Sequence, residues 1–382
     1  MALDRRREHR AWWSLARSAS LVGCAVGAMA AQQPRPHETF MKLGVLLVPE
    51  FCTEANLRLV RQCGATDVVL TCPGFSLSEL RKAVDRVRAV GLNVDVIERF
   101  VPHDKIVHGL PGRDEQLTQI KALIRNMGLC GIKTLCYNWM PSDDWTRTAL
   151  DVPDRGGALC TAFDVRAPIH KLAGQTLQAK TVATPASMLW ETLEGFLRDV
   201  LPVCEQSGVV LALHPDDPPI ANLHGKPQIV YDLDAIERVT RLVDSPANGI
   251  CFCAGTFASA GIDVPAAIRR LGKRIKFVHS RNVVHEPVNG LPAGSRFRET
   301  WQDTGDIDMV AAFQAYHDVL GDASGVVVRP DHVPTVEGES NGVPGYHVLG
   351  RLWALGYLRG LMESVQKGDG GKGVWRTPAP RL

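Results

Sequence analysis

Four residues whose side chains bind metal ions each follow a short apolar run in this sequence. The four residues are His214, Cys253, His279 and Asp331. The runs before them are Val209–Leu213, Gly249–Phe252, Ile275–Val278 and Gly325–Val328. Strands that alternate with helices form a parallel barrel, and residues just beyond the carboxyl ends of its strands converge on one mouth. We therefore expect these residues, which are 26 to 52 positions apart, to share one divalent cation.

The residue types narrow the choice of cation, although each residue alone also fits a structural role. A buried thiol is commonly inert, and a histidine at a strand end is often a packed core residue. Taken together, two imidazoles, a thiolate and a carboxylate favour manganese, iron(II), cobalt or zinc over calcium or magnesium. His214 also opens the run His214–Pro219, whose two acids and three prolines predict a rigid, electronegative loop.

The segment Arg329–His332 brings three candidate catalytic side chains into four positions. Asp331 can bind a cation or take up a proton, His332 can shuttle a proton, and Arg329 can neutralise a carboxylate. Further along the chain, Tyr346 is a candidate for acid–base chemistry or gating, and packing at the edge of the core would explain it equally well. The density of polar groups after one apolar run favours a functional role for the segment.

Four further residues are candidates for substrate binding: Arg281, Asn138, Arg147 and Glu98. An arginine at the mouth can hold a carboxylate with two parallel hydrogen bonds, although an arginine at the start of a loop is often a surface charge. Asn138 and Arg147 stand among aromatic residues after a predicted strand, a mixture typical of a sugar-sized pocket. Packing alone would explain the tryptophans there.

The elements that must position these residues are eight predicted strands alternating with eight predicted helices. This order predicts an α/β protein with a single (β/α)8 TIM barrel, in which Leu43–Val48 is the first strand and Thr53 and Ser76 begin helices as N-caps. Residues 141–187 and 281–306 are predicted to be long loops over the mouth. An open doubly wound sheet is less favoured, because no G-x-G-x-x-G turn follows the first strand.

The chain has 382 residues, enough for one barrel with extensions. We assign residues 41–366 to the barrel and 367–382 to a flexible tail. Residues 1–40 are an extension that either contains an export signal within residues 1–31 or precedes a true start at Met41.

The composition is that of an ordinary globular protein, with 45% apolar and 22% charged residues and a net charge of +2. This small net charge does not indicate a basic surface that binds nucleic acid. No apolar run reaches the roughly 18 residues of a membrane-spanning helix. Ten cysteines without a CxxC pair indicate thiols in a reducing compartment.

Several stretches of the sequence resemble the mannonate dehydratase family and occur in the family's order. They are Cys136–Pro141, Asp144–Thr148, His214–Pro219, Cys253–Gly255, Phe277–Arg281, Gly305–Met309, Arg329–His332 and Gly345–Arg351. The resemblance implies a xylose-isomerase-like barrel, Mn²⁺ or Fe²⁺ as cofactor, and loss of water from D-mannonate to give 2-dehydro-3-deoxy-D-gluconate.

By motif position, the resemblance puts the family's metal ligands on the four residues His214, Cys253, His279 and Asp331. It puts the family's active-site arginine, histidine and tyrosine on Arg329, His332 and Tyr346. It also implies a cytoplasmic enzyme if translation starts at Met41, and it is compatible with a homo-oligomer.

Four segments depart from the family pattern. Leu46–Glu50 lacks the polar and aromatic residues expected after the first strand, and Thr71–Gly74 lacks a His-rich segment. Gln302 stands where a histidine is expected, and the segment after the fourth predicted strand is short. These departures leave the metal ligands in place and bear on the substrate. Two alternatives therefore stay open: a sugar isomerase or epimerase on the same barrel, and a non-catalytic relative that binds a metal or a sugar.

Overall fold

Eight parallel strands close into a barrel in the computed structural model of the chain, which describes residues 39–141, 145–169, 184–339 and 343–368. The barrel strands are β1 (Lys42–Leu46), β2 (Asp67–Leu70), β3 (Asn93–Glu98), β4 (Thr134–Tyr137), β7 (Val210–Leu213), β10 (Asn248–Cys253), β11 (Ile275–Ser280) and β14 (Val327–Pro330). Each strand pairs with the barrel strands that precede and follow it in the chain, and β14 pairs with β1 to close the ring. The predicted (β/α)8 barrel is confirmed.

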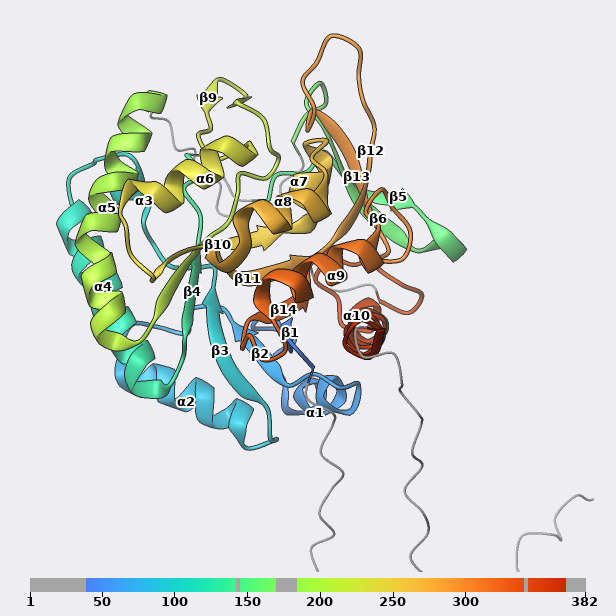
Figure 1. Cartoon of the computed structure of the whole chain (residues 1–382), viewed down its shortest axis with the longest axis horizontal. Helices are drawn as coiled ribbons and strands as arrows, with labels where there is room; N and C mark the ends of the chain where they lie inside the picture. The colour runs from blue at the N-terminus through green and yellow to red at the C-terminus, as the bar shows by residue number, and fades with distance from the viewer. Residues whose placement is uncertain (1–38, 142–144, 170–183, 340–342, 369–382) are drawn as a thin grey trace, which may run out of the picture. The chain divides into compact units, whose positions relative to one another are not determined.

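Eight longer helices accompany the barrel strands, as the apolar periodicity predicts (Figure 1). They are α1 (Glu54–Gln62), α2 (Leu77–Arg88), α4 (Arg113–Cys130), α5 (Ala186–Ser207), α6 (Leu233–Leu242), α8 (Val264–Leu271), α9 (Met309–Leu320) and α10 (Leu349–Gly368). Thr53 and Ser76 cap α1 and α2 as predicted, each accepting a hydrogen bond from a backbone N–H of the first turn.

Short elements were harder to predict. The helices α3 (Asp104–Val107) and α7 (Ala254–Ser259) and the 3₁₀ turns η1 (Arg155–Gly157) and η2 (Gly272–Arg274) are too short to show a helical period. Tyr346 lies just before α10.

The prediction of two structureless loops over the mouth is wrong where these segments form strands. Four strands, β5 (Ala149–Pro153), β6 (Leu159–Asp164), β12 (Asn282–His285) and β13 (Arg296–Thr300), form an antiparallel sheet in the order β12-β13-β6-β5. In β13, Phe297 and Glu299 are both buried. Because Glu299 is charged, β13 lacks the alternation of apolar and polar residues that predicts a strand. A second small sheet pairs β8 (Asn222–Leu223) with β9 (Lys226–Pro227). Residues 142–144 and 170–183 of the first predicted loop lie outside the described residues.

The barrel interior is filled by one buried side chain from each strand. These are Leu46, Val69, Val96, Cys136, Ala212, Cys251, Phe277 and Val327. A larger apolar cluster includes the buried faces of the strands and of the helices, such as Leu80 and Val84 of α2. Because the interior layer is packed, it forms a floor for polar side chains that stand at the carboxyl ends of the same strands.

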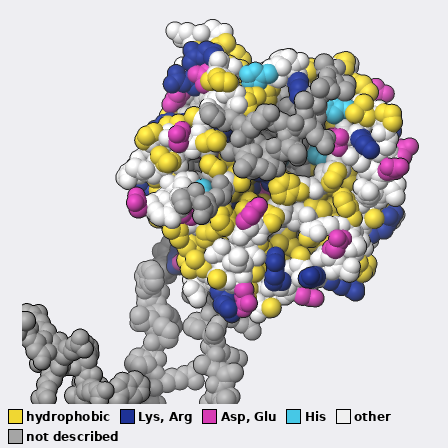
Figure 2. All heavy atoms as spheres, turned by 180° about the vertical axis from the view of Figure 1, so that it is seen from behind, with side chains coloured by type: hydrophobic (Ala, Val, Ile, Leu, Met, Phe, Trp, Pro, Cys, Tyr) yellow, Lys and Arg dark blue, Asp and Glu magenta, His cyan; other side chains and the backbone are white. Residues whose placement is uncertain are grey.

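Charged side chains of both signs are interspersed over the described part of the face shown in Figure 2. Exposed ion pairs such as that of Arg270 with Glu237 also occur on the protein surface, and pairs of this kind contribute little to stability. Within the described ranges, no helix combines the length and the apolar character that crossing a bilayer requires. The predicted export signal lies outside the described residues.

Candidate active site

A cavity of about 440 Å³ opens at the carboxyl ends of the barrel strands. Its described lining includes Arg99, Asn138, His214, His279, Asp331, His332 and Tyr346. These residues follow or end β3, β4, β7, β11 and β14, so the cavity is built by most of the barrel. Its volume and mixed polar and apolar lining suit a small polar ligand such as a sugar acid.

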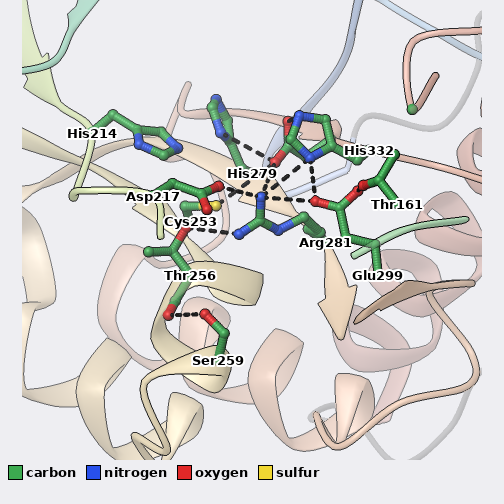
Figure 3. A network of polar contacts seen from close by, with 12 residues as sticks. Thr161, His214, Asp217, Cys253, Thr256, Ser259, His279, Arg281, Glu299 and His332 are labelled. Carbon is green, nitrogen blue, oxygen red and sulfur yellow. Dashed lines mark hydrogen bonds and ion pairs between the residues drawn. The ribbon is translucent and has the colours of Figure 1, made fainter. Parts of the chain in front are cut away.

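The four predicted metal ligands converge beside this cavity. One donor atom each from His214, Cys253 and His279 lie within 4.8 Å of one another. The Oδ2 atom of Asp331 is 3.7 Å from Cys253 Sγ and 3.8 Å from His279 Nδ1. Cys253 and His279 are paired in the register of β10 and β11, which explains how residues far apart in sequence meet (Figure 3).

The two imidazoles are oriented in a way that suits a cation. His214 Nδ1 donates a hydrogen bond of 2.6 Å to the Pro215 carbonyl, which leaves Nε2 as the nitrogen that can bind a cation. Neither ring nitrogen of the buried His279 has a hydrogen-bond partner among the described residues, and Glu98 Oε1 lies 3.3 Å from its Nε2. A buried nitrogen without a hydrogen bond is costly unless another ligand takes its lone pair. This set of nitrogen, sulfur and oxygen donors therefore fits a first-row transition metal.

Arg329 lies between two buried carboxylates. Its Nε and Nη2 donate to Glu98 at 3.0 and 2.8 Å, and its Nη1 is 2.8 Å from Asp331 Oδ1. Burial alone would raise the pKa of both carboxyls. Interactions with Arg329 and His279 nevertheless hold the pKa of Glu98 well below its usual range, and interactions with His332 and Arg329 do the same for Asp331. Both groups are carboxylates at neutral pH, which suits Asp331 to bind a cation.

A chain of hydrogen bonds runs through His332. Its Nδ1 donates to Glu299 Oε1 at 2.6 Å, and its Nε2 therefore accepts from the Tyr346 hydroxyl at 3.0 Å. The hydroxyl oxygen in turn accepts from Arg99 Nη1 at 2.7 Å. The Trp145 ring packs on His332 with its centroid 4.4 Å away, which fixes the plane of the imidazole.

Burial sets the resting protonation state of this chain. It lowers the pKa of His332 in spite of the nearby Asp331 and Glu299 carboxylates, so the imidazole is neutral. It raises the pKa of Tyr346 to about 12 although Arg99 opposes the shift, so the hydroxyl keeps its proton. The site thus offers a neutral acceptor and a protonated donor in direct contact.

Arg281 and Arg147 form a buried network behind the cavity wall. Arg281 Nη1 is 2.6 Å from Asp217 Oδ2 and 3.3 Å from Glu299 Oε1, while Nη2 donates to Thr256 at 2.9 Å (Figure 3). Arg147 contacts the same two carboxylates, at 3.0 and 2.5 Å. Both arginines are fully buried, and neither is among the described residues that line the cavity.

The two acids of this network are held as carboxylates. Burial would raise the pKa of each, but Arg147 and Arg281 keep the pKa of Asp217 well below its usual range. Arg147 and His332 lower the pKa of Glu299 to about 2 against the same effect of burial. The network therefore supplies His332 with a permanently charged partner.

The sequence alone does not identify three residues of this site. They are Asp217 and Glu299 of the buried network and Arg99 of the cavity. Asp217 had a signal, since it lies in the electronegative loop after His214. Glu299 stands on β13, which was predicted to be loop. Arg99 follows β3 with a left-handed backbone (φ 70°), as does the next residue, Phe100 (φ 58°), and no local pattern announces this conformation.

Gln302, noted above as a departure from the family pattern, is fully buried behind His332. Its Nε2 donates to the His332 carbonyl at 3.4 Å and to the Ser280 carbonyl at 3.5 Å. Asn138, by contrast, lines the cavity, and its side-chain oxygen accepts from the Met140 N–H at 3.2 Å. Glu98 also reaches the cavity lining beside Arg329.

Comparison with protein families relates this geometry to known enzymes. The model of the D-mannonate dehydratase (UxuA) family matches residues 51–186 and 168–371. Mannonate dehydratase 2 of Halalkalibacterium halodurans is 35% identical over 297 residues, which covers 72% of this chain and 83% of that protein. The mannonate dehydratase of Enterococcus faecalis is 34% identical over 346 residues, or 81% of this chain and 94% of that protein.

Solved structures agree with these relationships. The crystal structure of mannonate dehydratase from Streptococcus suis serotype 2 superposes with a TM-score of 0.77 at 31% identity, covering 90% of this chain and 99% of that one. A xylose isomerase domain protein from Planctomyces limnophilus shares the fold at 14% identity, with a TM-score of 0.57 over 87% of this chain and 100% of that one.

Proposed function

Because the chain belongs to the D-mannonate dehydratase (UxuA) family, we propose that it is a hydro-lyase that removes water from a sugar acid, D-mannonate, to give 2-dehydro-3-deoxy-D-gluconate. One observation carries this proposal beyond family membership. A single cavity lies beside a group of convergent metal-binding donors and is lined by a tyrosine that keeps its proton next to a neutral histidine.

The reaction sets clear demands on a site. The proton on carbon 2 of a sugar acid is only weakly acidic, and hydroxide on carbon 3 is a poor leaving group. The C2–H bond breaks as a base takes the proton, and the C3–O bond breaks as an acid supplies a proton to form water. The enol that remains gains a proton at carbon 3, loses the proton of its hydroxyl group at carbon 2, and so becomes the 2-keto acid. The site must therefore supply a base, an acid and a means of stabilising negative charge.

We assign the cation to His214, Cys253, His279 and Asp331, and we propose Mn²⁺ or Fe²⁺ as its identity. The unsatisfied nitrogens of the buried His279 and the mixed donor set support this assignment. When bound, such a cation would draw electron density from a substrate oxygen and stabilise the charge that develops as the C2 proton leaves.

We assign His332 as the base and Tyr346 as the acid from the states in which they rest. A proton gained by His332 Nε2 is stabilised by the adjacent Glu299 and Asp331 carboxylates. A proton lost from the Tyr346 hydroxyl leaves a charge that faces Arg99. The 3.0 Å hydrogen bond between them allows the proton to return after each turnover. Asp331 is a poor base here, because its pKa is held well below its usual range.

The arginines divide into two groups in this proposal. Arg99 lines the cavity and is positioned to contact the substrate, together with Asn138. Arg147 and Arg281 are positioning residues, because their guanidinium groups are occupied by Asp217 and Glu299. Arg329 plays a similar part for Asp331 and Glu98, although it also reaches the cavity.

The proposal is tested by incubating the full-length protein with a panel of sugar acids and free sugars in the presence of Mn²⁺ or Fe²⁺. Formation of a 2-keto-3-deoxy acid from D-mannonate, and its loss in a Tyr346→Phe variant, would support the assignment. A changed free sugar without loss of water would instead identify an isomerase or epimerase. If the protein binds sugar acids but converts none of them, it is a non-catalytic relative. Isomerisation of a free sugar, or binding without conversion, would each overturn the proposal.

A further inference from the structure

A second group of potential ligands lies deeper in the barrel than the candidate metal centre. One donor atom each from Cys136, Cys251 and His279 lie within 4.8 Å of one another. All three residues are buried, and neither cysteine is oxidised. Cys251 precedes Cys253 by two positions on β10, so both side chains point into the barrel and Cys251 stands one layer lower.

The surroundings of this group are apolar, and its histidine is shared with the upper group. Val96, Ala212 and Phe277 belong to the same interior layer as the two thiols. The Phe277 ring stands edge-on to His279, with centroids 4.8 Å apart. His279 is common to both donor groups, and neither of its ring nitrogens has a hydrogen bond among the described residues. One unsatisfied imidazole therefore stands between two sets of sulfur-containing ligands.

We propose that Cys136, Cys251 and His279 form a second cation site that takes a soft divalent metal ion such as Zn²⁺ or Cd²⁺. Thiolate ligands select such ions, and this site has two sulfurs where the upper site has one. On binding, two S–H bonds break, two metal–sulfur bonds form, and two protons leave to solvent. The complex of a dication, two thiolates and a neutral imidazole has no net charge, which suits its apolar surroundings.

The route of entry and the consequence of binding follow from the geometry. Cys136 and His279 both line the cavity, so an ion reaches the lower site through the space that receives the substrate. Because His279 is common to both sites, a soft ion in the lower site removes a ligand from the upper one. Zn²⁺ or Cd²⁺ should therefore weaken the binding of Mn²⁺ at the upper site, and this effect should require Cys136 and Cys251.

The test is a Cd²⁺ titration of the full-length, reduced protein, followed by the ultraviolet absorption of cadmium–thiolate bonds. In a Cys253→Ala variant the upper site has no sulfur, and the absorption should remain. Adding Cys251→Ala should remove most of it and weaken Cd²⁺ binding by about tenfold or more. The matched control adds Cys204→Ala instead, which removes a buried free thiol of α5 and should leave the absorption unchanged.

Two outcomes would overturn the second site. Absorption that disappears with Cys253→Ala alone would place all the bound cadmium at the upper centre. Absorption that survives the loss of Cys251 would assign it to other thiols. If the Cys251→Ala variant does not fold, the nearly isosteric Cys251→Ser serves in its place, and the result for Cys253→Ala alone still decides between the sites. The titration needs no substrate, so it is independent of the proposed dehydratase activity.

Discussion

Replacing Glu299 with glutamine tests the buried network behind the cavity. The substitution keeps the shape of the side chain and removes its charge, which leaves Arg147 and Arg281 to share Asp217. The pKa of Glu299 falls from an ordinary value of 4.5 to about 2 in the folded protein. A difference of this size corresponds to about 3 kcal/mol of folding free energy, similar to the cost of breaking a buried ion pair. We expect the melting temperature to fall by about 5–10 °C.

The same variant should lose activity, because the Glu299 carboxylate holds the Nδ1–H tautomer of His332. A glutamine presents either its oxygen or its amide to the ring and no longer stabilises the protonated imidazole. We expect kcat for D-mannonate to fall by about 100-fold or more. The effect on stability should also depend on pH. A carboxyl whose pKa is depressed by folding stabilises fully above about 4.5 and loses its contribution toward about 2, so the two melting curves should converge in acid.

The control is Glu286→Gln, which removes the charge of a surface glutamate that pairs with Arg296 at 2.7 Å. An exposed pair of this kind contributes at most about 1 kcal/mol, so this variant should melt close to the parent protein and remain active. Equal melting temperatures for the two variants would refute the reasoning about stability. A Glu299→Gln variant with kcat within about threefold of the parent would refute the role given to His332.

Three further results are expected. A Tyr346→Phe variant should fold normally and lose about 100-fold in kcat with little change in KM, whereas a rise in KM alone would argue against its role as acid. Chelation of Mn²⁺ should lower the melting temperature by an amount equivalent to about 2.7 kcal/mol if the ion was present at 100 times its Kd, and His214→Ala should abolish this dependence in differential scanning fluorimetry. Burial raises the pKa of Asp67 to about 6, so its charge opposes folding at pH 8 and is neutralised near pH 4. Asp67→Asn should therefore stabilise the protein against urea by up to about 3 kcal/mol at pH 8 and by little at pH 4.

The barrel and its ligand group were accessible from sequence for a simple physical reason. Strands covered on both faces need continuous apolar runs, and a polar residue directly after such a run is placed at the mouth by the fold itself. His214, Cys253 and His279 each satisfy this pattern, and the structure brings their donor atoms together. The pattern needs only local sequence and one rule about parallel barrels.

Glu299 and Arg99 could not be found in this way. The carboxylate of Glu299 is tolerated in a buried strand only because Arg147 and Arg281, which are remote in sequence, lie against it. Arg99 reaches Tyr346 through a left-handed backbone that sequence does not announce for a residue other than glycine. The positions of both residues in the site depend on contacts with residues remote in sequence, whereas the positions of the predicted ligands depend on the strand that each one follows.

The charge balance of the buried network supports the proposed dication. Three arginines and four carboxylates are joined by ion pairs: Arg147, Arg281 and Arg329 with Glu98, Asp217, Glu299 and Asp331. Three positive and four negative charges leave the network at −1, and a Cys253 thiolate would bring it to −2. Because an uncompensated charge is costly to bury, a divalent cation beside Asp331 and Cys253 would offset the excess negative charge of these ion-paired groups. A monovalent ion would offset less of this negative charge, so the same groups that hold His332 also favour a dication.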